Sequence, residues 1–308
     1  MRRSSSGRHA VLLLTGLLIA PAASAQTGAP TVQERLGHPK EARLLIIHAD
    51  DVGMARSVNR ATFEALERGW ITSASILVPC PWFPDVARFA RAHPEADLGV
   101  HLALNSEWTP YRWGPLLGLG KVPSLVDEEG YLPLVQGPVV ANAVLAEVEA
   151  ELRAQIDRAR GAGITLSHLD THMGTLLWSP GLAEVYRRLG RDYGLPILAD
   201  REAAARGLVS AAEVTIDSVL EMRPGVPPAE WRAAYEKMLA PLGPGVYELI
   251  VHLAYDDEEM RGATWDHPDW GAAWRQADFD LIRDPAFQRF LKDQGFVLIR
   301  WRELARAR

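Results

Sequence analysis

The sequence of 308 residues has one cysteine, no block of basic residues and no glycine-rich turn after its first predicted strand. The single Cys80 excludes an intramolecular disulfide, and its apolar surroundings indicate a small core residue. A formal net charge of −6 argues against a nucleic-acid partner. The missing G-x-G-x-x-G motif argues against a dinucleotide-binding fold. With 48% hydrophobic and 23% charged residues, the composition is that of an ordinary globular protein.

The N-terminal 25 residues have the order of a secretory signal peptide. Three arginines precede the apolar run 10–20, and small residues follow it up to Ala25. A membrane anchor is the alternative, but the run is short for a bilayer span and ends at Pro21. We therefore predict cleavage near Ala25, an exported (periplasmic or secreted) protein and no stable membrane anchor. Because three arginines and no acidic residue are removed, the formal net charge falls from −6 to −9.

The remaining chain divides into an N-terminal tail, residues 26–42, and a single domain, residues 43–308, in which short apolar runs alternate with amphipathic segments. Strands are predicted at 43–49, 74–78, 98–104, 165–169, 196–198, 247–253 and 296–300, and helices at 57–68, 83–92, 141–160, 182–193, 230–239 and 287–294. This alternation implies parallel β/α units, and about seven strands favour an α/β barrel-like fold over an open sheet. Two long connections, 105–140 and 254–284, interrupt the pattern and are expected to be functional.

Acidic and histidine side chains mark four predicted strand ends. They are Asp50 and Asp51 in the first strand, His101 in the third, His168, Asp170 and His172 in "SHLDTHMG", and His252 in "YELIVHLAY". In a β/α barrel the active site lies at the C-terminal ends of the strands. Each histidine taken alone has a second explanation, a hydrogen-bonded core residue. Together they indicate a catalytic divalent metal, because one aspartate and two histidines are a suitable ligand set that leaves a position open for water.

A metal would also explain why a buried strand ends in two adjacent carboxylates, Asp50 and Asp51. An ion beside one aspartate removes the repulsion that would otherwise raise the pKa of a carboxyl group. The neighbouring aspartate can then act as a base toward a water whose pKa the metal lowers to about 7. Successive side chains of a strand point in opposite directions, so the strand must break for both aspartates to reach one site. Gly53 offers the backbone freedom for that break.

Several segments resemble the YdjC-like (ChbG) carbohydrate deacetylase family, and the resemblance covers most of residues 43–308. The segments are "ADDVG" (49–53), "ITSASILV" (71–78), "GVHLAL" (99–104), "PSLVDEEGYL" (123–132), "SHLDTHMG" (167–174) and "YELIVHLAY" (247–255). The resemblance implies a deacetylase-type β/α barrel. It also implies a hydrolase of a linear amide C–N bond, which removes acetyl groups from N-acetylated sugars such as chitin fragments with one divalent metal ion.

Carried over position by position, the resemblance implies a role for five residues. Asp51, His101 and His172 match the metal ligands, Asp50 matches the general base, and His252 matches the histidine that protonates the leaving amine. Two imidazoles among three ligands favour zinc, with magnesium as the alternative. The sugar, its chain length and the oligomeric state stay open.

Further residues are expected around this set. His168 and Asp170 alternate with His172 along the chain, so they are candidates to support the ligands from behind, and Asp170 orients either a ligand histidine or His252. Four aromatic side chains could offer flat faces to a small carbohydrate substrate, with core packing as the alternative for each. They are Trp108, Tyr111, Trp113 and Trp178.

Two other functions compete with the deacetylase. A glycoside hydrolase would use Asp50 or Asp51 with another carboxylate such as Asp170, and needs no metal. It would leave the histidines unexplained. A non-catalytic carbohydrate-binding protein on the same scaffold is the third hypothesis, because a fold does not fix a function. A pure binder, however, has no need of a base beside a metal site.

Overall fold

The computed structural model describes residues 30–305, and the chain from Thr31 on forms one compact unit. The predicted signal peptide lies outside the described residues, and the division into signal peptide, tail and domain stays a prediction. Part of the segment expected to be a tail folds onto this unit. Thr31 caps the short helix α1 (Val32–Arg35), and Val32 and Leu36 pack against a buried apolar cluster. Within residues 30–305, no helix combines the length and apolar character needed to cross a membrane.

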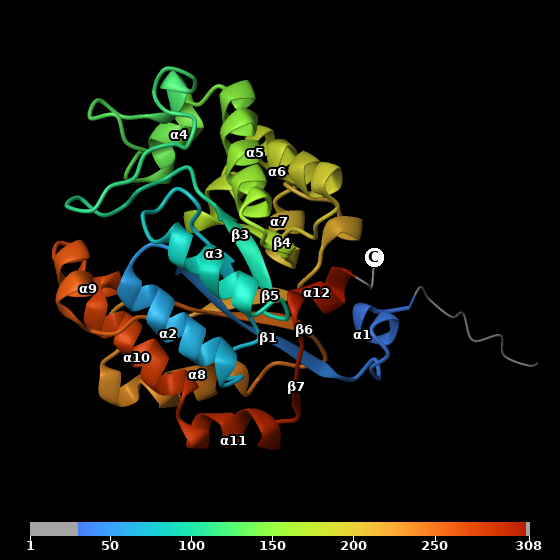
Figure 1. The fold of residues 1–308 in the computed structure, drawn as a ribbon. Helices are drawn as coiled ribbons and strands as arrows, with labels where there is room; N and C mark the ends of the chain where they lie inside the picture. Colours follow the sequence, from blue (N-terminus) through green and yellow to red (C-terminus); the bar gives the residue numbers. More distant parts are fainter. Residues whose placement is uncertain (1–29, 306–308) are drawn as a thin grey trace, which may run out of the picture. The chain divides into compact units, whose positions relative to one another are not determined.

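A parallel seven-stranded sheet forms the centre of this unit (Figure 1). Its strands are β1 (Arg43–Val52), β2 (Ser73–Ile76), β3 (Leu98–Leu102), β4 (Leu166–Thr171), β5 (Ser218–Glu221), β6 (Gly245–Val251) and β7 (Phe296–Leu298). The order is β4-β3-β2-β1-β6-β5, and β7 pairs with the first residues of β1. The predicted α/β class with seven parallel strands is confirmed. The strands that carry site residues therefore end at the same edge of the sheet.

Irregular backbone hydrogen bonds connect the two outer strands, β4 and β5, and give the sheet its barrel-like path. Beyond β4, Leu169 pairs with segment 196–198 through a single parallel bridge at Ile197. Thr215 then donates its N–H to the Ala199 carbonyl, and Asp217 donates to a carbonyl of β6 just before β5 begins. The predicted strand at 196–198 is thus reduced to one bridge, because it pairs with β4 only around Leu169, and the chain beyond it bonds to an irregular segment at Thr215.

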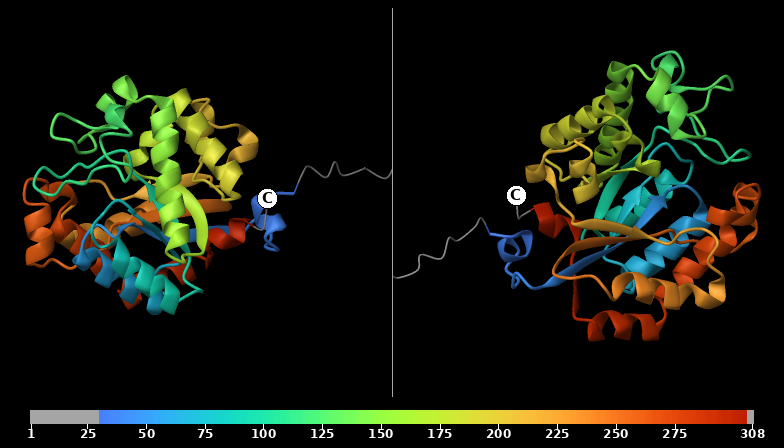
Figure 2. Two further views of the ribbon diagram at one scale, coloured as in Figure 1. Left: turned by 45° about the horizontal axis from the view of Figure 1, so that its top comes forward. Right: turned by 180° about the vertical axis from the view of Figure 1, so that it is seen from behind.

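Helices surround the strands, and most of them lie on the outer face (Figures 1 and 2). They are α2 (Arg56–Glu67), α3 (Phe83–Ala92), α4 (Gln136–Asn142), α5 (Leu145–Gly161), α6 (Pro180–Tyr193), α7 (Arg201–Ala205), α8 (Trp231–Leu239), α9 (Glu258–Ala263), α10 (Ala272–Ile282), α11 (Pro285–Asp293) and α12 (Trp301–Leu304). In both figures α2, α8, α10 and α11 gather on one side of the strands, and α5, α6 and α7 on the other.

Three expectations about the elements are wrong in detail. The predicted helix 141–160 is divided into α4 and α5, because the backbone is extended at Ala143 and Val144. Strand β5 was not predicted, since its four residues are all half-buried and show neither an apolar run nor alternation. The connection 254–284 is not a loop but contains α9 and α10. This last difference matters for the site, because α10 supplies Trp274, Arg275 and Asp278 to it.

Strand β1 is buried along both faces, as its apolar run predicts. On one face Leu45 and Ile47 belong to the main core under the helices. On the other face Leu44 and Ile46 pack with Trp301 of α12 in a second cluster. Since side chains alternate along a strand, this second face continues with His48 and then Asp50. The inner face of β1 thus changes from apolar to polar toward its C-terminal end.

Candidate metal centre and active site

The backbone of β1 breaks where its two aspartates lie. The register between β1 and β2 shifts between Ala49 and Val52, and Asp51 has a φ of 61°. Positive φ is uncommon for a residue with a side chain, although aspartate tolerates it better than most. Gly53 follows with a φ of 101°. The expected break is therefore present, but it is centred on Asp51 itself, and it lets Asp50 and Asp51 approach the same site.

The three predicted metal ligands lie together at the C-terminal edge of the sheet. Asp51 Oδ1 lies 3.6 Å from His101 Nε2 and 3.3 Å from His172 Nδ1. One ligand atom from each residue lies within 4.8 Å of the others, and all three residues are buried. Asp51 Oδ1 has no hydrogen-bond partner. Two imidazole nitrogens and one orphaned carboxylate oxygen are a donor set that fits a divalent ion such as zinc.

Each of the two imidazoles is held by a carboxylate on its other nitrogen. His101 Nδ1 donates to Asp170 Oδ1 at 2.9 Å, and His172 Nε2 donates to Glu107 Oε2 at 2.8 Å. The nitrogens that remain are the two that face Asp51. A carboxylate behind a ligand histidine is the usual arrangement at metal sites, because it fixes the tautomer and the ring. Asp170 thus lies behind a predicted ligand and not behind His252.

Glu107 was not among the residues that the sequence predicts. It lies in the connection after β3, two residues beyond Asn105 and next to Trp108. Its carboxylate changes the pKa of the His172 imidazole. Burial opposes protonation of this imidazole, but the charges of Glu107 and Asp51 raise its pKa well above the usual value. The only sequence signal was an acidic residue in a long connection near a strand end.

Arg275 of α10 holds the other oxygen of Asp51. The guanidinium is buried, and its Nη2 donates to Asp51 Oδ2 at 2.7 Å while Nε donates to the Trp270 carbonyl at 3.0 Å. Burial alone would raise the pKa of Asp51, but Arg275 and His172 hold it well below its usual range. Asp51 is therefore an ionised carboxylate with Oδ2 occupied and Oδ1 turned toward the imidazoles. The sequence pattern does not point to Arg275, which is 224 residues away in the connection 254–284.

Asp50 and His252 face each other beside this group. His252 Nε2 lies 3.2 Å from Asp50 Oδ1, and Asp50 Oδ2 lies 3.6 Å from His101 Nε2. Burial and the nearby charge of Asp51 raise the pKa of Asp50. Burial and the Arg275 guanidinium lower the pKa of His252 to about 3, so its imidazole is neutral near pH 7. This pair combines a carboxylate of raised basicity with a neutral imidazole in hydrogen-bond range.

Helix α10 also fixes the position of His252. The backbone N–H of His252 donates to Asp278 Oδ2 at 2.9 Å, and Asp278 Oδ1 accepts hydrogen bonds from Trp231 and Tyr235. The rings of two tryptophans near the start of α10, Trp270 and Trp274, lie 5.6 and 5.1 Å from the imidazole. Burial raises the pKa of a further carboxyl group, that of Glu221 at the end of β5, to about 7. Its Oε1 lies 3.7 Å from His252 Nε2.

The predicted aromatic residues have different surroundings. Trp113 is buried with its ring 5.9 Å from His172, and buried Trp108 lies under the Arg275 guanidinium at 5.5 Å. The Tyr111 hydroxyl donates to the Met54 carbonyl at 2.6 Å. Trp178 is 52% exposed, and no ring contact to a site histidine is found for it within residues 30–305. The connection after β3 therefore brings Trp108 and Trp113 against the polar groups of the site, whereas Trp178, which follows β4, has no such ring contact in the described chain.

His168 lies one layer deeper than predicted. Its Nδ1 shares a hydrogen bond with Ser167 Oγ at 2.9 Å, and its ring stacks on Trp301 at 4.7 Å. In the described part of the chain no hydrogen bond joins it to a predicted ligand. A different histidine of this deeper layer contacts Asp170: His48 of β1, whose Nε2 lies 3.1 Å from Asp170 Oδ2. His48 was not predicted, although it precedes Asp50 on the same face of β1.

The Arg275–Asp51 pair leads to a prediction about stability. We expect Arg275→Met to lower the free energy of unfolding of the metal-free protein by about 3–5 kcal/mol, because it leaves Asp51 as an unpaired buried charge. Added Zn²⁺ should recover part of this loss by binding Asp51. Urea unfolding with and without Zn²⁺ measures both effects. Arg88→Met is the control, since Arg88 forms an exposed ion pair with Asp85 and should change stability by less than about 1 kcal/mol. Equal losses in the two variants would contradict the prediction.

Comparisons with known proteins match this chain over most of its length. A family model described as YdjC-like protein matches residues 44–293. A carbohydrate deacetylase of Thermus thermophilus is 35% identical over 284 residues, which are 89% of this chain and 98% of that protein. A carbohydrate deacetylase of Geobacillus stearothermophilus is 29% identical over 263 residues, 85% of this chain and 98% of the relative. A crystal structure from Enterococcus faecalis, of a protein named for cellobiose-phosphate cleavage, is similar with a TM-score of 0.73 and 26% identity, covering 85% of this chain and 99% of that chain. The resemblance found in the sequence is confirmed.

Proposed function

Because the chain belongs to the YdjC-like family, we propose that it is a metal-dependent carbohydrate deacetylase that hydrolyses the amide bond of an N-acetylated sugar. Two relatives that are matched over 98% of their length carry the name carbohydrate deacetylase. The observation that carries the proposal is the group of Asp51, His101 and His172, whose free ligand atoms face one another beside Asp50. The proposed substrate is a small N-acetylated sugar or oligosaccharide of the chitin-fragment kind.

The proposed cofactor is one divalent ion held by Asp51 Oδ1, His101 Nε2 and His172 Nδ1. Such an ion would polarise the acetyl carbonyl and lower the pKa of a nearby water. The two imidazoles favour zinc over magnesium. Asp170 and Glu107 keep the imidazoles in the tautomers that leave these nitrogens free, and Arg275 keeps Asp51 ionised.

In the proposed reaction the protein's own residues move one proton from water to the amine. Asp50 accepts the proton as the water oxygen bonds to the carbonyl carbon, and its raised pKa suits a base. His252 is neutral and lies 3.2 Å from Asp50, so it can receive this proton and pass it to the sugar nitrogen. The C–N bond then breaks, and the products are a free amine and acetic acid, which ionises to acetate in water. This route gives His252 the role of the acid without requiring it to be protonated beforehand.

The proposed role of His252 predicts a dependence on the leaving group. We expect His252→Ala to lower kcat on an acetamide by about 10²–10⁴-fold, the usual contribution of a positioned acid. The kcat on an aryl acetate should fall by a smaller factor, because a phenolate leaves without being protonated. Rates on the two substrates and the metal content of the variant test this. Equal losses on amide and ester, or a variant without metal, would contradict the assignment.

Release of acetate from N-acetylated oligosaccharides, with and without a chelator, tests the function as a whole. A deacetylase should release one acetate per new amine, stop when the metal is removed and recover when Zn²⁺ is returned. A glycoside hydrolase should instead produce new reducing ends, and its activity should be the same with and without the chelator. A non-catalytic binding protein should retain the sugar and release neither product.

Export of this enzyme is a further part of the proposal. It rests on the arginines, the apolar run 10–20 and the small residues before Ala25. N-terminal sequencing of the protein from the medium or periplasm should begin near Gln26. A chain that keeps its first residues and stays in the cytoplasmic fraction would contradict it.

A further inference from the structure

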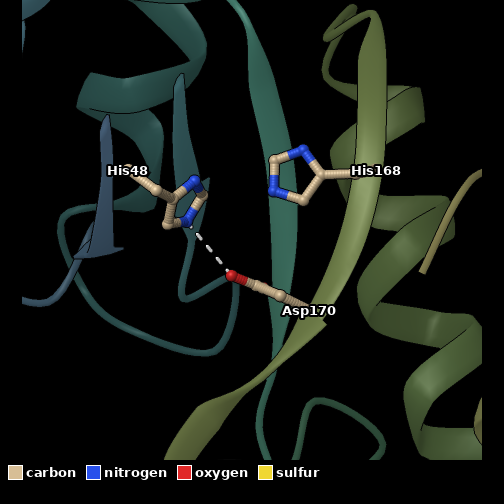
Figure 3. A group of neighbouring side chains, drawn as sticks. All are labelled: His48, His168 and Asp170. Atoms are coloured by element: carbon tan, nitrogen blue, oxygen red, sulfur yellow. Dashed lines mark ion pairs between the residues drawn. The ribbon is translucent and has the colours of Figure 1, made fainter. Parts of the chain in front are cut away.

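A group of buried polar side chains lies inside the barrel-like sheet, one layer below the candidate metal centre. Figure 3 shows three of its members, His48 from β1 and His168 and Asp170 from β4. Ser75 of β2 is the fourth. None of the four is more than 1% exposed. Because His48 precedes Asp50 by two residues on the same face of β1, the group supports the site from within the barrel.

Asp170 connects this group to the site through its two oxygens. Oδ1 accepts the hydrogen bond from His101 Nδ1, while Oδ2 accepts one from Ser75 Oγ at 2.7 Å. His48 Nε2 lies 3.1 Å from Oδ2 and 3.0 Å from Ser75 Oγ. The carboxylate is therefore held on both sides and cannot turn without losing buried polar contacts. Loss of such contacts is costly in a buried setting. Because His101 Nδ1 donates to this fixed carboxylate, the ring of His101 is held in one orientation as well.

His168 has the same burial but a different role. Its Nε2 points toward His48 and Asp170 in Figure 3 yet has no hydrogen-bond partner. The ring is held by Ser167 on Nδ1 and by stacking on Trp301. A Cβ at Gly99 would come within 2.4 Å of it, so the ring packs directly on the backbone of β3. His168 is thus a packing residue that lies beside the His48–Asp170 contact without taking part in it.

The same three residues also offer ligand atoms within 4.8 Å of one another, which makes a second ion the competing explanation. The position of Ser75 is evidence against a second ion. Its hydroxyl is within hydrogen-bond distance of both His48 Nε2 and Asp170 Oδ2, and so lies where an ion shared by these atoms would have to bind. The contacts among the group are those of a hydrogen-bonded support.

We propose that His48 is a positioning residue for the metal centre, which fixes His101 through Asp170 so that His101 Nε2 faces Asp51. This inference rests on the proposed function, in which His101 holds the ion. It assigns no contact between His48 and substrate or metal. Its expected effect is on metal affinity and on the geometry of the ion, because partners behind a ligand typically contribute 10–100-fold to affinity.

The test compares two equally buried histidines in the full chain. Zinc affinity is measured by competition with a chromogenic chelator, and ligand geometry by the visible spectrum of the Co²⁺-substituted protein. We expect His48→Leu to weaken zinc binding by about 10–100-fold and to change the Co²⁺ spectrum. His168→Leu should lower the melting temperature but leave both metal readouts unchanged. His48→Gln, whose amide N–H can replace Nε2–H, should recover most of the affinity.

Each remaining outcome decides the matter. Wild-type zinc affinity in a folded His48→Leu variant, or equal losses in His48→Leu and His168→Leu, overturns the inference and leaves the proposed function intact. Two zinc ions in the wild-type chain, with one lost in His48→Leu, overturn it in favour of a second ion. A wild-type chain that binds no divalent ion overturns the proposed function as well. Should His48→Leu not fold, His48→Met removes the same Nε2–H with a more flexible side chain, and unchanged zinc affinity in that folded variant overturns the inference.

Discussion

Asp50→Asn should retain the full metal content of the wild type and lose about 10²–10⁴-fold in kcat, the usual contribution of a general base. The substitution keeps the size of the side chain and removes only its ability to accept a proton. Asp50 Oδ1 has no hydrogen-bond partner in the described chain and faces His252 Nε2, so it is available to a water and to the next proton acceptor. Burial and the charge of Asp51 raise the pKa of Asp50, which favours proton uptake.

Metal analysis and turnover of Asp50→Asn test this assignment against a specific alternative. Asp50, Asp51 and His252 also present ligand atoms within 4.8 Å of one another, so Asp50 could instead be a ligand. In that case the variant would lose metal together with activity. The control is Asp97→Asn, which replaces another buried carboxylate just before β3, at the opposite end of the strands. It should lower stability, since Asp97 binds Ser73 and Arg302, but leave kcat close to the wild-type value.

Loss of any one of the three proposed ligands should abolish tight metal binding and lower kcat by more than about 10³-fold, since a metal ion contributes several kcal/mol to the transition state. The variants are Asp51→Asn, His101→Ala and His172→Ala. Asparagine is preferable to alanine at Asp51, because its side-chain oxygen can still accept the hydrogen bond of buried Arg275. This separates the loss of a ligand from the loss of folding.

Elemental analysis of the purified variants and acetate release in excess Zn²⁺ check this expectation. His93→Ala is the control, because His93 is a partly exposed histidine whose neighbours are Glu67 and Glu95. A variant that keeps one equivalent of metal removes its residue from the ligand set. Retained activity in a metal-free chain would contradict the proposed mechanism altogether.

That the three proposed ligands would lie close together was predictable from the sequence for a simple reason. Parallel strands present their C-terminal ends at one edge of a sheet, so polar residues that end separate strands are brought together. Asp51, His101 and His172 follow this rule and lie within 4.8 Å of one another. The break that brings Asp50 to the same side was also predictable, because two adjacent carboxylates at the end of a buried strand require one.

The residues that hold these three side chains from behind were not predictable to the same extent. Glu107 lies in a long connection, and Arg275 lies in a segment expected to be a loop. Nothing in the local pattern of either segment says which strand end it will contact. The pairing of Arg275 with Asp51 spans 224 residues and depends on how α10 packs across the end of β1. A buried guanidinium is stable only opposite a carboxylate, and that match forms in the folded state alone.

The sequence by itself determined the parallel α/β class, the positions of the main strands along the chain and the four strand ends that carry polar residues, because hydrophobic periodicity is a local property. Only the tertiary structure decided which of these residues support the others. It placed His48 and not His168 against Asp170, turned Asp170 toward His101, and set Arg275 on Asp51. The physical reason is that a buried polar group must find its partner wherever the folded chain brings one, and that distance along the chain does not limit the choice.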